Sequence, residues 1–120
     1  GMANPNALVV ANAAMQAVHM VGMPEARILL SEAAVYVATS KKSNASYLAI
    51  NKALEDVSTK DTGTIPMHIR NAPIKEMEKL GYHEGYLYPH DFPGHWVEQQ
   101  YLPDKMLGTK YYIKDENIPE

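Results

Sequence analysis

The fifteen residues from Pro89 to Pro103, PHDFPGHWVEQQYLP, constrain the possible folds of this chain more than any other part of it. Pro89, Pro93 and Pro103 each remove a backbone donor and fix φ, and Gly94 permits a left-handed φ. No regular helix or strand accommodates that pattern. We therefore predict an ordered but irregular segment, named the strap, whose apolar side chains are buried against elements formed earlier in the chain. Those side chains are Phe92, Trp96, Val97, Tyr101 and Leu102.

Caps, breakers and apolar stripes predict an all-α fold in a single domain spanning residues 1–120. Three main helices are expected near residues 5–21, 24–41 and 44–60, with a shorter one near 73–80, and everything after Gly81 as coil or brief turns. Asn4-Pro5 has the composition of an N-cap and first helical position, and Gly22 that of a C-terminal stop. Either Ser43 or Asn44 is expected to cap the third helix.

The first two helices are rich in alanine, which permits close helix contacts, so we expect them to pack as an antiparallel hairpin. The first helix also carries two apolar stripes, which a single neighbour does not cover. We predict that the first stripe is a self-association face, giving a dimer or a tetramer. The stripes are Leu8, Ala11, Met15 and Val18, and Val10, Ala14, Ala17 and Val21. On the third helix we predict an inner face of Tyr47, Ile50, Leu54 and Val57, and an outer face of Lys52, Glu55 and Asp56.

Composition restricts the class of protein. A hydrophobic content of 46% and a charged content of 21% are typical of a folded domain. No apolar run approaches the roughly 20 residues of a membrane span, and no signal peptide is visible, so we expect a cytoplasmic protein. The chain has no cysteine, which excludes disulfides and thiolate chemistry. Gly1 before Met2 has the form of a cloning remnant.

Motifs for catalysis are missing. The glycines are scattered singly, without a phosphate-binding loop, and no serine lies in a nucleophile elbow. His83, His90, Asp91 and His95, with His68 as a further candidate, follow no spacing typical of a metal site. We therefore expect no catalytic activity, no cofactor and no stoichiometric metal. A small enzyme with a metal on His83, His90 and His95 is the weakest alternative.

Nucleic-acid binding is a second alternative. Lys41, Lys42 and Lys52 give the region of the third helix a modest basic character. The net charge of −3 provides no general attraction to nucleic acid. These lysines are therefore weak candidates for DNA contact.

Several segments together resemble one family. They are residues 22–27 (GMPEAR), 42–50 (KSNASYLAI), 65–70 (IPMHIR), 81–82 and 88–103, followed by Tyr111-Tyr112. The sequence is similar to the C-terminal region of the replication-associated recombination ATPases, the bacterial RarA (MgsA) family, whose human relative is the Werner-helicase-interacting ATPase. The strap is the specific part of the resemblance, through Pro89, His90, Asp91, Phe92, Pro93, Gly94, Trp96, Gln99, Gln100, Tyr101, Leu102 and Pro103.

The resemblance implies a role in assembly. Members of the family are AAA+ ATPases that act at stalled replication forks and DNA ends, and their helical C-terminal region joins subunits, typically into tetramers. The chain would then be part of that oligomerisation domain, with further family helices before the equivalent of Asn4-Pro5. ATP and Mg²⁺ would belong to a parent module that is absent here, since no catalytic residue of the family maps onto this sequence. The parent's partners would be DNA and replication or repair proteins, at the bacterial nucleoid.

Overall fold

The computed structural model describes all residues, 1–120, and every regular element in it is helical. The main helices are α1 (Asn6–Val21), α2 (Ala26–Thr39) and α3 (Ala45–Thr59), and α4 (Lys75–Lys79) is short. The predicted all-α fold of three main helices and a shorter fourth is confirmed. The remaining elements are four single turns of 3₁₀-helix: η1 (Met67–Ile69), η2 (Pro89–Asp91), η3 (Pro93–His95) and η4 (Asp104–Met106).

Contacts along the chain divide it into two compact units. The first, called the helical unit, combines residues 1–54 with residues 110–120 and holds α1, α2 and most of α3. The second, called the irregular unit, comprises residues 55–109 and contains the end of α3, α4 and all four 3₁₀ turns. The strap therefore belongs to the irregular unit.

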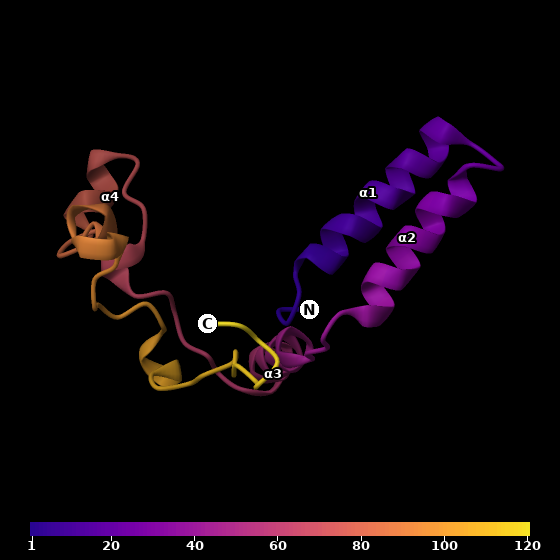
Figure 1. Ribbon diagram of the computed structural model, residues 1–120. Helices are drawn as coiled ribbons and strands as arrows, with labels where there is room; N and C mark the ends of the chain where they lie inside the picture. Colours follow the sequence, from indigo (N-terminus) through magenta and orange to yellow (C-terminus); the bar gives the residue numbers. More distant parts are fainter. The chain divides into compact units, whose positions relative to one another are not determined.

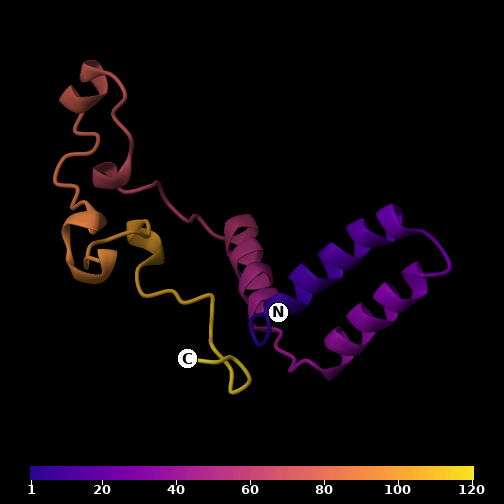
Figure 2. The same ribbon diagram turned by 45° about the horizontal axis from the view of Figure 1, so that its top comes forward.

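In the helical unit, α1 and α2 form the predicted antiparallel hairpin and lie side by side in both views (Figures 1 and 2). Gly22 ends α1 with a φ of 72°, and its N–H donates to the carbonyl of Val18 over 3.0 Å. That positive φ is a conformation that glycine adopts without strain. Small side chains form the seam of the hairpin, where Ala26 and Ala33 are buried.

The start of α1 differs from the prediction. Pro5 is the capping residue, and no side chain caps the helix. The Asn4 amide instead donates to the hydroxyl of Ser40 over 3.0 Å and to that of Tyr36 over 3.3 Å. Asn6 donates to the same tyrosine hydroxyl over 3.0 Å, and these two asparagine contacts lower the pKa of Tyr36, with that from Asn6 the larger cause. Asn4 therefore ties the open end of the hairpin together, because its long-range partners compete successfully with the local backbone.

The C-terminal segment, residues 110–120, returns to α3 within the helical unit. Ser43 accepts a hydrogen bond from the N–H of Ala45 over 3.2 Å, so one of the two predicted caps is confirmed, and it also donates to Asp115. The Asn117 amide donates to the carbonyl of Lys42 over 2.8 Å. Ile118 is buried, as is Ala45 at the start of α3.

The irregular unit has little regular backbone pairing, and side chains supply much of what is missing. The Gln99 amide both donates to the carbonyl of Leu87 over 2.7 Å and accepts from its N–H over 3.2 Å. His68 Nε2 donates to the carbonyl of Gln100 over 2.6 Å. Only two hydrophobic residues of this unit are buried, Val97 and Met106. None of the helices in either unit combines the length and the hydropathy that crossing a membrane requires.

Candidate functional site

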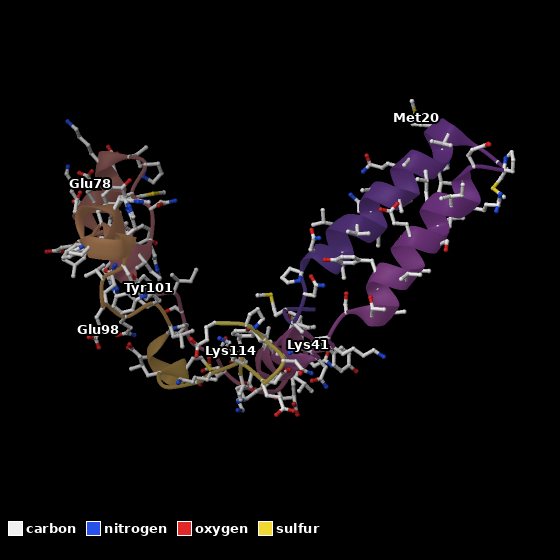
Figure 3. All side chains as sticks on the ribbon, in the orientation of Figure 1. Met20, Lys41, Glu78, Glu98, Tyr101 and Lys114 are labelled. Carbon is white, nitrogen blue, oxygen red and sulfur yellow. The ribbon has the colours of Figure 1, made fainter.

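The predicted self-association face lies on the side of α1 that the hairpin leaves uncovered. Leu8 is 77% exposed and Met15 is 58% exposed, while Ala11 is also exposed and Val18 is half-buried. Met20, labelled in Figure 3, lies near the end of α1 and is 87% exposed. Leu8 and Met15, the two largest side chains of this stripe, thus remain mostly uncovered by the hairpin.

The second stripe of α1 faces α2. Val10, Ala14 and Ala17 line an open groove of about 240 Å³ together with Leu29 and Ala33 of α2. Because alanines dominate the α1 side of this groove, the seam buries little large apolar surface there. The hairpin therefore gains less from burial than its sequence composition implies.

The predicted inner face of α3 is wrong. Tyr47, Ile50, Leu54 and Val57 are all exposed, whereas Asp56, which we placed outside, is buried at 5% exposure. Lys60 donates to the Asp56 carboxylate over 3.1 Å. The side of α3 that contacts the rest of the helical unit is built from small residues: Ala45, Ala49 and Ala53. Ala49 and Ala53 line an open pocket with Tyr111 and Tyr112 of the C-terminal segment, and Ile50 lies at the same pocket.

The C-terminal segment also changes the surroundings of the candidate DNA-contact residues. Lys52 Nζ donates to the carbonyl of Lys110 over 3.1 Å and lies 5.7 Å from the centre of the Tyr111 ring. The bond from Asn117 to the carbonyl of Lys42 brings the same segment to the link between α2 and α3. Lys41 and Lys114, both labelled in Figure 3, extend from this region as well. Five lysines therefore lie around α3, and two of them, Lys110 and Lys114, were not among the predicted DNA-contact residues.

The strap is ordered by its polar residues more than by its rings. Gln100 Nε2 donates to the carbonyl of Leu102 over 2.8 Å and to the carboxylate of Asp104 over 2.6 Å. The Tyr101 hydroxyl donates to the carbonyl of Val97 over 3.0 Å. Phe92 and Leu102 are half-buried, but Trp96 and Tyr101 are 64% and 45% exposed, so the predicted burial of these two rings is wrong. The side chain that is buried is Val97, the neighbour of Trp96, since adjacent residues of an extended segment point in opposite directions.

The histidines are divided among different contacts. The ring of His83 stacks near Tyr86, with 4.7 Å between ring centres. His90 and His95 contact each other through their Nδ1 atoms, which are 2.8 Å apart. No group of three or more His, Cys, Asp or Glu side chains has the geometry to hold a metal ion. The set of His83, His90 and His95 is therefore not assembled as a three-ligand centre.

Comparison with known proteins gives a consistent result over the whole chain. Residues 1–120 match the family described as MgsA AAA+ ATPase C terminal. The chain is 42% identical over 112 residues to replication-associated recombination protein A of Bacillus subtilis, covering 93% of this chain and 27% of that protein. Its identity to the Escherichia coli K12 protein of the same name is 38% over 114 residues, covering 94% of this chain and 26% of that protein.

A eukaryotic protein gives a similar match. The chain is 39% identical over 113 residues to the ATPase WRNIP1 of Dictyostelium discoideum, covering 93% of this chain and 13% of that protein. The chain thus spans about a quarter of the length of these two bacterial relatives and less of the eukaryotic one.

Proposed function

The chain belongs to the family of MgsA AAA+ ATPase C-terminal regions, and from this membership we propose that it is a non-catalytic assembly domain. In this proposal it joins copies of a DNA-dependent AAA+ ATPase that maintains replication forks and takes part in recombination and repair. The ATP and Mg²⁺ sites belong to the remainder of the parent protein, and this part carries no cofactor. The parent's partners are DNA and replication or repair proteins at the bacterial nucleoid.

The exposed apolar stripe of α1 carries the proposal. Leu8 and Met15 follow one another at a spacing of seven residues, so they lie on one face of the helix, and both are more than half exposed. Large apolar side chains gathered on one face of a helix are typical of surfaces that bind another protein. A second copy of the chain supplies the same surface, and closed symmetry is the usual outcome of such pairing. A dimer or a tetramer is therefore the expected state.

The apolar face of α3 that was predicted to be its inner face supports the same proposal. Tyr47, Ile50 and Leu54 are 65%, 53% and 60% exposed, although they recur at the spacing of an amphipathic helix. The sequence pattern marks this face for burial, and the contacts within the helical unit leave it open. Assembly gives both open faces, on α1 and on α3, an apolar environment.

Light scattering on a sizing column tests the proposal at micromolar protein concentration. The unmodified chain is expected to elute with the mass of a dimer or tetramer. Met15→Glu places a charge in the α1 face and is expected to reduce the mass to that of a monomer. The matched control is Gln16→Glu, which adds the same charge at the next exposed position and leaves the mass unchanged. A monomeric unmodified chain would refute assembly.

A Leu54→Glu variant separates the two faces. If it dissociates the assembly while Met15→Glu does not, the interface lies on α3 and the assignment to α1 is wrong. If neither variant changes the mass of an assembled chain, both faces are excluded as its interface.

A second candidate function, contact with DNA, is favoured by the gathering of lysines around α3. Lys52 Nζ donates to the backbone carbonyl of Lys110, and the rings of Tyr47 and Tyr112 on the same unit are 65% and 46% exposed. Lysines attract the phosphate backbone and exposed rings stack on unpaired bases, so this combination is typical of single-strand binding. Binding of a labelled oligonucleotide is expected to weaken with added salt and with Lys52→Gln, but not with Lys75→Gln in the irregular unit. Equal effects of the two variants would count against this surface.

A further inference from the structure

The loop that carries His90 and His95 folds so that the two imidazole rings meet. His90 lies in η2, His95 ends η3, and their ring centres are 4.9 Å apart with the planes inclined by 64°. Their Nδ1 atoms are 2.8 Å apart, which is hydrogen-bond distance, so one nitrogen carries the proton and the other accepts it. Both residues are exposed.

The backbone of this loop is fixed before any ligand arrives. The N–H groups of Asp91 and His95 donate to the carbonyls of Tyr88 and Phe92, each over 3.0 Å, and that of Phe92 donates to Pro89 over 3.1 Å. Between the two turns, Gly94 has a φ of 68° and His95 one of 55°. These two successive left-handed residues reverse the chain and return the ring of His95 to that of His90. A side chain held at positive φ outside glycine is uncommon and marks a conformation imposed by its surroundings.

The separation of the two nitrogens matches a metal chelate. At metal–nitrogen distances of about 2.0–2.1 Å, two neighbouring ligands at a right angle lie about 2.9 Å apart, whereas tetrahedral ligands lie about 3.3 Å apart. The observed 2.8 Å corresponds to the right-angle case. Imidazole pairs in square-planar or octahedral geometry are typical of Cu²⁺ and Ni²⁺.

We infer that His90 and His95 form a two-ligand site for a divalent transition-metal ion of the Cu²⁺ or Ni²⁺ class. On binding, the ring that carries its proton on Nδ1 releases it to water and takes up a proton on its exposed Nε2, so that both neutral rings have a free Nδ1 lone pair. A small rotation of each ring about its Cβ–Cγ bond then directs both lone pairs at one ion. Water completes the coordination. The inference is independent of the proposed assembly function and concerns a binding site, not catalysis. The spacing of the histidines did not predict a metal site here, because spacing does not specify the left-handed turn at Gly94 and His95.

The single tryptophan of the chain provides the readout. Trp96 follows His95 directly and is 64% exposed, so an open-shell ion on the histidine pair lies close enough to quench its fluorescence. CuCl₂ is titrated into the full chain. The expected result is a saturable loss of Trp96 emission with one ion bound per chain. Emission that shows no saturable change would overturn the inference.

Two variants at positive φ form a matched pair. His95→Asn removes one ligand, and His83→Asn removes a histidine from a loop position with a φ of 68° that does not contact the pair. Asparagine tolerates left-handed φ, so both backbones are preserved. His95→Asn is expected to weaken Cu²⁺ binding by about tenfold or more, because two linked ligands become one, and His83→Asn leaves it unchanged.

His90→Gln removes the other histidine of the pair. Far-UV circular dichroism checks that each variant keeps its helices. Loss of quenching in both His90→Gln and His95→Asn supports a shared site. Unchanged quenching in either of them, or equal weakening in His83→Asn, would show that the ion binds elsewhere and that the pair is not a chelate.

Discussion

In the helical unit, α1 and α2 pair their backbone groups within each helix, whereas the irregular unit closes isolated turns with single backbone bonds and adds side-chain bonds from residues such as Gln99 and Gln100. The helices can therefore leave large apolar side chains such as Met15 outside without losing their shape. The irregular unit has no such freedom, because its loops depend on the side chains that bond to them. Side-chain hydrogen bonds thus shape the loops of one unit, while helices of the other leave large apolar side chains uncovered within the chain.

Exposed apolar side chains occur in two different settings in the two units. Leu8 on α1 belongs to a face of similar residues, which has the properties of an interface. Trp96 in the strap is exposed without such a face, and its neighbour Val97 occupies the small core instead. A motif residue can therefore be distinctive in sequence and yet contribute little to burial.

The largest effect is expected at the seam of the hairpin. Ala26→Leu inserts a larger side chain at the seam of the hairpin, where Ala26 is fully buried and does not line the open groove, and should lower the free energy of unfolding by about 1–3 kcal/mol. Urea unfolding followed by circular dichroism measures it. The control is Ala34→Leu, at an exposed position of the same helix, which should be nearly neutral. Equal results for the two would mean that the seam is not closely packed.

A smaller effect is expected from the side chain that replaces backbone pairing in the irregular unit. Gln99→Ala leaves both backbone groups of Leu87 without their partner and should lower the free energy of unfolding by about 1 kcal/mol. Gln16→Ala on the exposed side of α1 is the matched control and should change little, since alanine is a strong helix former. If both glutamines prove dispensable, the contrast between the two units is lost.

The smallest effect is expected at Trp96. A fully buried tryptophan replaced by alanine costs about 3–5 kcal/mol, but Trp96→Ala should lower the free energy of unfolding by less than about 1 kcal/mol because the ring is largely exposed. Thermal unfolding measures the change, with Val97→Ala as the buried neighbour that should cost more. A loss as large as that of a buried ring would indicate that Trp96 is covered by a partner molecule in solution.

Local signals in the sequence predicted the helices well. Gly22 ends α1, Ser43 bonds to the start of α3, and the strap contains only single helical turns. These features depend on residues close together in the chain, so composition and spacing are sufficient to find them. Asn4 had the same local signal and took other partners, because Tyr36 and Ser40 arrive from α2.

Long-range features could not be predicted in this way. The stripe of Tyr47, Ile50 and Leu54 correctly indicated an amphipathic helix, but a stripe does not say which neighbour covers which side. The C-terminal segment lies against the side of α3 that carries Ala49 and Ala53. No local sequence pattern near Lys110 predicts this contact. The gathering of Lys110 and Lys114 with Lys52 was missed for the same reason. The meeting of His90 and His95 depends on backbone φ values, which the residue types alone do not specify.

The division of the helical unit between residues 1–54 and 110–120 has a consequence for the order of folding. A ribosome delivers the hairpin first, and its contacts are local, so α1 and α2 can pair while the rest of the chain is still being synthesised. The alanine side of α3 cannot form its contacts with Lys110 and Tyr111 until these residues have been synthesised, which happens after residues 55–109. Joining these ends closes a long loop, whose entropic cost grows only slowly with its length. The nascent chain therefore exposes both sides of α3 throughout that interval, and this is the period in which α3 is most available to bind a wrong partner.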